Sequence, residues 1–354
     1  HGSHSFQQNR HFFNSIKNIF QKESKKRLDS AQNAQNVDFQ SLRSPMESED
    51  QYHSKSNLSF SKHAENEAKT CSGSQRKAQK SSSNFGMKKS PNKGIKHIIA
   101  VASGKGGVGK STVACNLAIA IAHRHGLRVG VLDADVYGPS MHRMFNLEED
   151  SAQVNPETNL LLPPTNYGIK CMSMGVLTKS EDAAIWRGPM VMGAIRQMLN
   201  QVEWGDLDLL VVDMPPGTGD AQLTLTQDVK LSGAVIVSTP QDIALIDVVR
   251  GINMFHQVKV PIIGIVENMS YFQCSECKAT GKKHYIFGKS GARNKAQDLD
   301  IPFLGEIPIE EVIPVSGDEG KPVVVANKDS SSAKIFFDLG DKVMAFLQSD
   351  SSEE

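Results

Sequence analysis

The most constraining stretch of this chain joins an apolar, strand-like run to a glycine-rich loop and then to a helix. Residues 97–122 read HIIAVASGKGGVGKSTVACNLAIAIA, and residues 104–111 fit the pattern G-x-x-x-x-G-K-[ST]. Glycine lets the backbone wrap closely around a phosphate, while N–H groups at the start of the helix point toward it. The sequence therefore predicts a phosphate-binding loop at the carboxyl end of a buried strand.

The residues of this loop have separate expected roles. Lys110 is expected to neutralise charge on the β- and γ-phosphates of ATP, and the hydroxyl of Ser111 to bind Mg²⁺. A second lysine, Lys105, is not required by the pattern, so it is either a tolerated loop residue or a specialised one. The expected nucleotide-binding residues are Gly104, Lys105, Gly106, Gly107, Val108, Gly109, Lys110, Ser111 and Thr112.

Strand-like and helix-length segments alternate through the rest of the chain. The apolar, β-branched runs are HIIAVAS, VGVLDAD, LDLLVVDMP, AVIVSTP and PIIGIVENM, and the helix-length stretches between them are 111–125, 189–202, 221–228 and 242–256. Strands this uniformly apolar are typical of a parallel sheet covered by helices on both faces. We therefore expect a doubly wound, mostly parallel α/β domain over residues 96–348.

Carboxylates follow two of these strands. Asp133 and Asp135 end VGVLDAD, and Asp213 ends LDLLVVD. Both sets should emerge at the carboxyl edge of the sheet, where the phosphates are expected. We predict that Asp213 holds a metal-bound water and that Asp135 orients the attacking water, although either residue alone could be a helix cap or a turn residue.

The net charge of zero hides an asymmetry along the chain. Residues 1–95 carry 16 Lys and Arg against 8 Asp and Glu, and the remaining residues carry 23 against 31. Residues 1–95 are poor in aliphatic side chains and are predicted to be a disordered basic leader. Within it, HFFNSIKNIFQKESKKR is amphipathic and basic, which fits a transit peptide, a solvated tail or a partner-binding segment. Residues 349–354 form an acidic tail.

Neither a membrane segment nor nucleic-acid binding is indicated. No apolar run approaches the roughly 18 to 20 residues that a membrane span needs. The balanced overall charge gives no general preference for nucleic acid. We therefore expect a protein without an integral membrane segment and without a nucleic-acid partner.

A pair of cysteines lies in the segment YFQCSECKATGKKHYIFG. Cys274 and Cys277 form a C-x-x-C, whose thiolates can converge on one soft metal centre. One pair supplies two ligands, whereas a 4Fe–4S cluster or a tetrahedral zinc takes four, so a symmetric dimer would complete the set. The alternatives are a redox disulfide, half of a zinc site with His284, or an inert pair.

Several motifs together resemble one family. They are GKGGVGKS, DADVYGPS (133–140), WRGPM (186–190), DMPPGTGD (213–220), TPQDIALID (239–247), VENMS (266–270) and HYIFG (284–288). They resemble the Mrp/ApbC family of iron–sulfur cluster carriers, deviant-Walker-A P-loop NTPases of the SIMIBI, MinD-like type. The likeness spans residues 96–348. The chain is most similar to the mitochondrial, NUBPL-type branch, which is associated with assembly of respiratory complex I.

The resemblance implies several properties. Lys105 would cross a homodimer interface and contact the partner's nucleotide, and Asn268 would read the adenine edge unless it is a plain turn residue. Cys274 and Cys277 would bridge the subunits through a labile 4Fe–4S cluster. A slow ATPase would govern delivery of that cluster to apoproteins, in the mitochondrial matrix or otherwise in the cytoplasm. The competing hypotheses are a spatial-regulation ATPase of the ParA/MinD type without a cluster, and a metabolic kinase.

Overall fold

The computed structural model describes residues 94–148, 151–177 and 188–350, and one large sheet organises them. Its strand order is β10-β9-β8-β1-β7-β2-β6-β5, and every pairing is parallel except β5 with β6. The strands are β1 (Ile95–Ala102), β2 (Val129–Asp133), β5 (Thr165–Asn166), β6 (Ile169–Met172), β7 (Leu207–Asp213), β8 (Gly233–Ser238), β9 (Ile262–Glu267) and β10 (Phe303–Glu306). A small antiparallel pair, β3 (Gln153–Val154) and β4 (Leu161–Leu162), stands apart from it.

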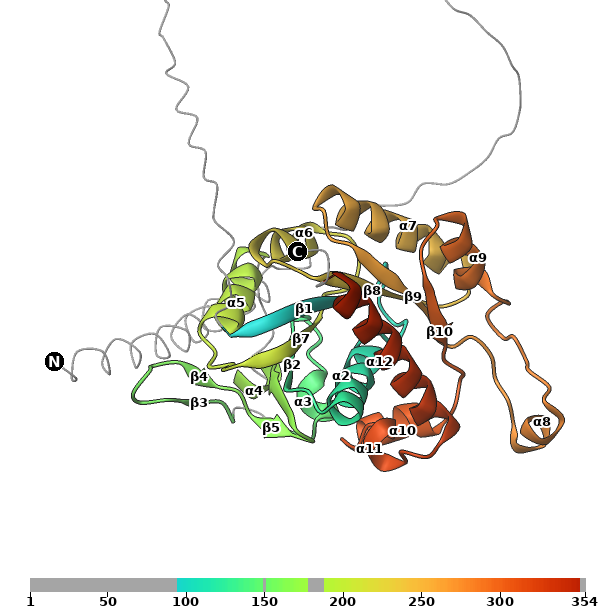
Figure 1. The fold of residues 1–354 in the computed structure, drawn as a ribbon, viewed down its shortest axis with the longest axis horizontal. Coiled ribbons are helices and arrows are strands. Elements are labelled where there is room, and N and C mark those ends of the chain that lie inside the picture. Colours follow the sequence, from blue (N-terminus) through green and yellow to red (C-terminus); the bar gives the residue numbers. More distant parts are fainter. Residues whose placement is uncertain (1–93, 149–150, 178–187, 351–354) are drawn as a thin grey trace, which may run out of the picture. The chain divides into compact units, whose positions relative to one another are not determined.

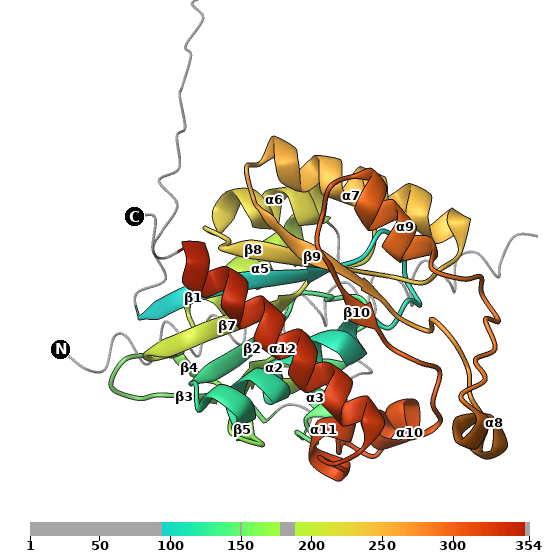
Figure 2. The ribbon, with the colours of Figure 1, turned by 45° about the vertical axis from the view of Figure 1, so that its right-hand side comes forward.

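Helices cover both faces of this sheet (Figures 1 and 2). One face carries α5 (Gly188–Asn200), α6 (Asp220–Asp228), α7 (Asp242–Gln257) and α9 (Gly291–Asp298). The other carries α2 (Lys110–His125), α3 (Met141–Met144), α10 (Val312–Asp318), α11 (Val323–Ala326) and α12 (Ser331–Asp350). Two short helices, α4 (Met174–Leu177) and α8 (Ser275–Thr280), complete the described elements.

The strand residues explain why two helical layers form. Along β1, Ile98 and Ala100 enter the core beneath α5, α6, α7 and α9, whereas Ile99 and Val101 enter the core beneath α2 and α12. Successive side chains of a strand point to opposite faces, so a strand that is apolar throughout must be covered on both. The predicted doubly wound α/β fold is confirmed.

The C-terminal helix α12 packs onto the sheet and onto α2, the helix that follows the glycine loop. Phe336, Leu339 and Val343 recur at helical spacing and are buried on this face. Burying a side chain of this size stabilises the fold by roughly 1.5–3 kcal/mol. Among the described helices, none combines the length and apolar character that a membrane crossing requires.

The predicted cysteine pair lies at the far end of a projecting segment, which we call the cysteine arm (residues 272–284). At its root, Phe272 pairs antiparallel with His284 and parallel with Ile309. Figures 1 and 2 show α8, which carries the second cysteine, at the tip of this arm and away from the sheet. Residues 1–93 of the predicted leader, the first two residues of the WRGPM motif (186–187) and residues 351–354 of the acidic tail lie outside the described residues.

Candidate functional site

The glycine loop after β1 is held closely by its neighbours. Gly109, with φ +79°, precedes α2, which begins at Lys110. An added Cβ would lie 2.2 Å from the Nδ2 atom of Asn268 at Gly109 and 2.4 Å from the Cβ atom of Asp247 at Gly104. The loop therefore requires glycine at both positions, for the left-handed backbone at the first and for the close approach of α7 at the second.

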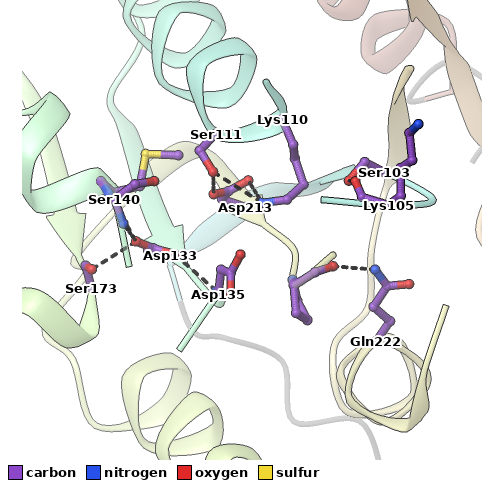
Figure 3. A network of polar contacts seen from close by, with 12 residues as sticks. Ser103, Lys105, Lys110, Ser111, Asp133, Asp135, Ser140, Ser173, Asp213 and Gln222 are labelled. Atoms are coloured by element: carbon purple, nitrogen blue, oxygen red, sulfur yellow. Dashed lines mark hydrogen bonds and ion pairs between the residues drawn. The ribbon is translucent and has the colours of Figure 1, made fainter. Parts of the chain in front are cut away.

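Three predicted residues meet at the start of α2 (Figure 3). The ammonium of Lys110 donates to Asp213 Oδ1 at 2.6 Å, and the hydroxyl of Ser111 donates to Asp213 Oδ2 at 2.5 Å. Lys110 and Asp213 are almost fully buried. A buried ammonium and carboxylate satisfy each other here, and a phosphate with its Mg²⁺ would offer each of them a new partner of opposite charge.

Asp133 lies beside Asp213 on the neighbouring strand and organises the next loop. Its carboxylate accepts the N–H groups of Asp135, Ser140 and Met141 at 3.0–3.1 Å, as well as the Ser173 hydroxyl at 3.0 Å (Figure 3). Burial, followed by the nearby charge of Asp213, raises the pKa of Asp133 to about 7. The Asp133 carboxylate therefore accepts backbone hydrogen bonds from both ends of the loop formed by residues 135–141.

Asp135, the predicted water-orienting residue, lies at the start of that loop and is partly buried. Burial raises the pKa of its carboxyl, and the positive charge of Lys110 acts in the opposite direction. The Asp135 carboxyl group therefore lies within range of the electrostatic influence of the Lys110 ammonium. Figure 3 shows Asp133, Asp135 and Asp213 gathered on one side of the lysine, as the strand ends predict.

Asn268 contacts the glycine loop directly from the end of β9. Its Nδ2 atom donates to the carbonyl of Val108 at 2.8 Å, and its Oδ1 atom accepts the N–H group of Met269 at 2.9 Å. The side chain is only 8% exposed. The structure therefore brings Asn268 to the predicted nucleotide site, through the loop backbone, and its adenine-reading role stays a prediction.

Lys105 differs from Lys110 in its surroundings. Its carbonyl accepts the Ser103 hydroxyl at 2.9 Å, and in Figure 3 its side chain runs away from the Lys110–Asp213 pair. Among the side chains that the structure describes, no carboxylate oxygen lies within 4.0 Å of its ammonium. The two lysines of the loop are thus directed to different places.

The two cysteines of the arm lie together and are accessible. Cys274 is exposed, Cys277 is partly exposed, and both are free thiols. The Sγ atom of Cys274 accepts the N–H group of Cys277 at 3.4 Å, and the Sγ atom of Cys277 lies 3.3 Å from Nε2 of His284. Hydrogen bonds from the backbone and thiol of Cys277 lower the pKa of Cys274, and donation of the Cys277 thiol to Cys274 raises the pKa of Cys277.

One chain does not complete a metal site. In the part of the chain that the structure describes, no group of three or more His, Cys, Asp or Glu residues is arranged to hold a metal ion. The other two described cysteines, Cys115 and Cys171, are fully buried in the core, and burial raises the pKa of both well above its ordinary value. A four-sulfur site therefore requires ligands from outside the described residues of one chain.

The sequence interpretation missed two structural roles. The motif DADVYGPS contains Asp133, but its function as a hub depends on the chain turning back so that Ser140 reaches it. Glu310 was not singled out, yet it accepts Lys278 Nζ of the cysteine arm at 2.9 Å and also the hydroxyl of Ser332 at the start of α12. No local pattern marks such a residue, because its partners lie 32 and 22 positions away.

Comparison with known families and proteins gives consistent matches. Residues 94–344 match the model of a ParA-type family described as NUBPL iron-transfer P-loop NTPase. The "iron-sulfur protein required for NADH dehydrogenase, mitochondrial" of Arabidopsis thaliana is 54% identical over 255 residues, 72% of this chain and 80% of that protein. The "iron-sulfur cluster transfer protein NUBPL" of Mus musculus is 51% identical over 263 residues, 74% and 81% of the two chains.

Solved structures show the same fold. A nucleotide-binding protein of Archaeoglobus fulgidus in complex with ADP has a TM-score of 0.58 and 43% identity, over 68% of this chain and 92% of that one. The cell-division ATPase MinD of Pyrococcus furiosus has a TM-score of 0.53 and 19% identity, over 70% and 98%. The second likeness concerns the fold alone.

Proposed function

The chain belongs to the NUBPL family of iron-transfer P-loop NTPases, and on that premise we propose that it transfers iron–sulfur clusters during assembly of respiratory complex I. The observation that carries the proposal is the presence, in one domain, of a complete phosphate loop and an exposed pair of cysteines on a projecting arm. The loop supplies a nucleotide switch, and the thiols supply ligands for the cargo.

The loop residues fit ATP with Mg²⁺. Gly104 and Gly109 keep the backbone free of side chains, Lys110 would bind the phosphates, and Ser111 with Asp213 would hold the metal ion. Mg²⁺ in such sites neutralises charge that develops on the phosphates. Asp135 would orient the attacking water. We propose slow hydrolysis, because the use of ATP in a carrier is to change conformation rather than to produce ADP quickly.

The cargo site is proposed to form between two copies of the chain. Cys274 and Cys277 supply two thiolates, and a 4Fe–4S cluster takes four cysteines. A twofold axis beside α8 would bring two pairs together and build the set from identical halves. This arrangement also accounts for why the described part of one chain holds no complete metal site.

The surface around the nucleotide supports pairing. Large apolar side chains are exposed in the loop after β2 and at the start of α7, where Tyr137 is 66% exposed, Ile243 67% and Ile246 56%. Both segments lie at the carboxyl edge of the sheet, next to the glycine loop. Exposed apolar side chains that gather at one edge are typical of an interface. We propose that Lys105 crosses this interface to the partner's nucleotide.

The proposed recipients are iron–sulfur apoproteins, complex I subunits among them, and the proposed location is the mitochondrial matrix. The support is the Arabidopsis relative, 54% identical, which is a mitochondrial iron–sulfur protein required for NADH dehydrogenase. A spatial-regulation ATPase of the MinD type shares the fold. Such a protein has no use for an exposed cysteine pair, so the pair favours the carrier.

The proposal is tested by removing one thiol. The Cys274→Ala chain should bind ATP as the parent does, because its cysteine arm lies away from the glycine loop. After anaerobic reconstitution with iron and sulfide it should retain almost no iron, since each half-site has lost one of its two ligands. Cys71→Ala, which removes the cysteine of the predicted leader, is the matched control and should load like the parent. Equal iron in the Cys274→Ala chain and the parent would contradict the carrier function.

A further inference from the structure

The two thiols of the cysteine arm have different surroundings. The sulfur of Cys274 accepts a backbone N–H group within its own turn of chain, from Cys277 at 3.4 Å. The sulfur of Cys277 instead lies 3.3 Å from the Nε2 atom of His284. His284 belongs to the returning limb of the arm, by which we mean the residues that follow α8 (281–284). The pair is therefore chemically unequal before any cargo arrives.

His284 is held in place although its side chain is exposed. Its N–H group donates to the carbonyl of Phe272 at 2.9 Å, and the N–H group of Phe272 donates to the His284 carbonyl at 2.8 Å. Phe272 is in turn paired with Ile309 of the main body. The imidazole is thus presented to Cys277 from an anchored backbone.

The adjacent residue strengthens this anchor. The ammonium of Lys283 lies 3.7 Å from the centre of the Tyr271 ring and 3.7 Å from a carboxylate oxygen of Glu306. A cation over an aromatic ring and beside a carboxylate gains from both contacts. The returning limb is therefore fixed at two successive residues, 283 and 284, and the position of the imidazole beside Cys277 follows from the fold of the arm.

We propose that His284 is a positioning residue for cluster carriage, a role that rests on the function proposed above. A sulfur bound to iron carries no proton and can only accept a hydrogen bond, so the Nε2–H group of His284 would be the donor to Cys277. Such a donation withdraws charge from the sulfur, which weakens its bond to iron and raises the reduction potential of the cluster. Cys277 is then the ligand that dissociates from iron first, whereas Cys274 stays bound.

The transfer step is a ligand exchange without net electron transfer. The Fe–S bond to Cys277 breaks as an Fe–S bond to a cysteine of the recipient forms, and the thiol proton of the recipient passes to the sulfur of Cys277. The Nε2–H group of His284 donates to that sulfur throughout, because the sulfur of a thiol can accept a hydrogen bond as the sulfur of a thiolate does. The same contact therefore stabilises the start and the end of the exchange.

The experiment compares three variants of the full chain after anaerobic reconstitution with iron and sulfide. His284→Ala removes the donor, His284→Gln keeps an N–H donor on a side chain of similar reach, and His256→Ala is a matched exposed histidine on α7. The measurements are iron content, the reduction potential of the bound cluster, and the rate of transfer to an apo-ferredoxin.

We expect His284→Ala to load iron, to show a lower reduction potential than the parent, and to transfer its cluster about tenfold more slowly, the lower end of the 10- to 100-fold cost usual for outer-shell partners of metal ligands. His284→Gln should recover most of the rate, and His256→Ala should match the parent.

Four outcomes would overturn the inference. If His284→Ala had the reduction potential and transfer rate of the parent, the contact would have no effect on the cluster. If it bound less iron than the parent at an unchanged reduction potential, the role of His284 would be merely structural. If the electron–nuclear double resonance spectrum of the parent's cluster showed a histidine nitrogen bound to iron, His284 would be a ligand instead. A parent chain that loads no iron would overturn the carrier function as well, which separates that failure from the others.

Discussion

At the scale of single residues, Asp133 shows how burial and hydrogen bonding oppose each other. Four donors surround its carboxylate, which favours the charged form, yet burial and the neighbouring charge of Asp213 raise its pKa to about 7. An unfolded aspartate has a pKa of about 3.9. Between these two values the folded chain binds a proton that the unfolded chain does not.

This difference predicts a pH-dependent stability. Because the native state holds the extra proton, the free energy of unfolding should fall as pH rises from about 4 to about 7, by at most about 1.4 kcal/mol per pH unit, and then level off. The side chain of the Asp133→Asn variant does not ionise, so the variant lacks this pH dependence. The free energy of unfolding of the parent minus that of the variant should therefore be lower at pH 7.5 than at pH 5.5. Urea unfolding of the nucleotide-free chains at the two pH values measures it. A difference independent of pH would contradict the prediction.

At the scale of elements, the cysteine arm is connected to the nucleotide site by a short path. Asn268 contacts the glycine loop, and only five residues separate it from Cys274. The intervening chain runs along residues 307–309, with hydrogen bonds from Ser270 N–H to Ile307 O and from Ile309 N–H to Tyr271 O. A displacement of the glycine loop by nucleotide can therefore reach the thiols through β9 and the strand-like segment that follows it.

A second connection fixes the tip of the arm. Glu310, with a side chain only 12% exposed, accepts Lys278 of the arm and Ser332 of α12. If this ion pair orients α8, then Lys278→Met, Glu310→Gln and the double variant should all retain less cluster than the parent and to a similar extent, because removing either partner already breaks the pair.

The expected loss of cluster retention is up to about fivefold, since ion pairs near a surface contribute 0.2–1 kcal/mol. The measurement is the half-life of the bound cluster in the presence of a chelator, with ATP affinity as the control that should not change. Losses that add in the double variant would show that the two residues act independently.

The elements also show what a sequence can and cannot predict. β1, β2, β7, β8 and β9 were predicted because each is apolar throughout, and α2, α5, α6 and α7 lie within two residues of their predicted bounds. β10 and α9 were not predicted, because the strand is four residues long and the helix GARNKAQD is largely polar. Within the site, the glycine loop was readable from its pattern. The approach of His284 to the cysteine pair was anticipated only as one alternative, half of a zinc site. The contacts of Asn268 with Val108 and of Glu310 with Lys278 and Ser332 were not readable, because they join chain segments that meet only in the folded state.

At the scale of the whole molecule, the proposed role of Lys105 makes a claim about two chains rather than one. A lysine that reaches its own nucleotide and a lysine that reaches the partner's look alike in a single chain. In the structure its side chain runs away from Lys110 and Asp213. That direction favours a target outside the chain's own site, and mixed dimers can test it.

Lys105→Ala and Lys110→Ala should each be almost inactive as ATPases, the first because both sites lack the crossing cation and the second because neither site holds the phosphates. When the two variants are mixed and allowed to exchange partners, half of the dimers contain one chain of each kind. In such a dimer the Lys105→Ala chain keeps Lys110 and receives Lys105 from its partner, so one of the two sites is complete.

The mixture should therefore recover about a quarter of the parental rate, since random pairing of two kinds of chain makes half the dimers mixed and each has one working site. If Lys105 served its own nucleotide instead, the Lys105→Ala chain would lack it in every pairing and the mixture would stay inactive. The measurement is steady-state phosphate release at a fixed total chain concentration, with a Lys105→Ala, Lys110→Ala double variant mixed with Lys105→Ala as the control. In that control no chain has both its own Lys110 and a partner that carries Lys105. Activity there would therefore contradict the crossing arrangement.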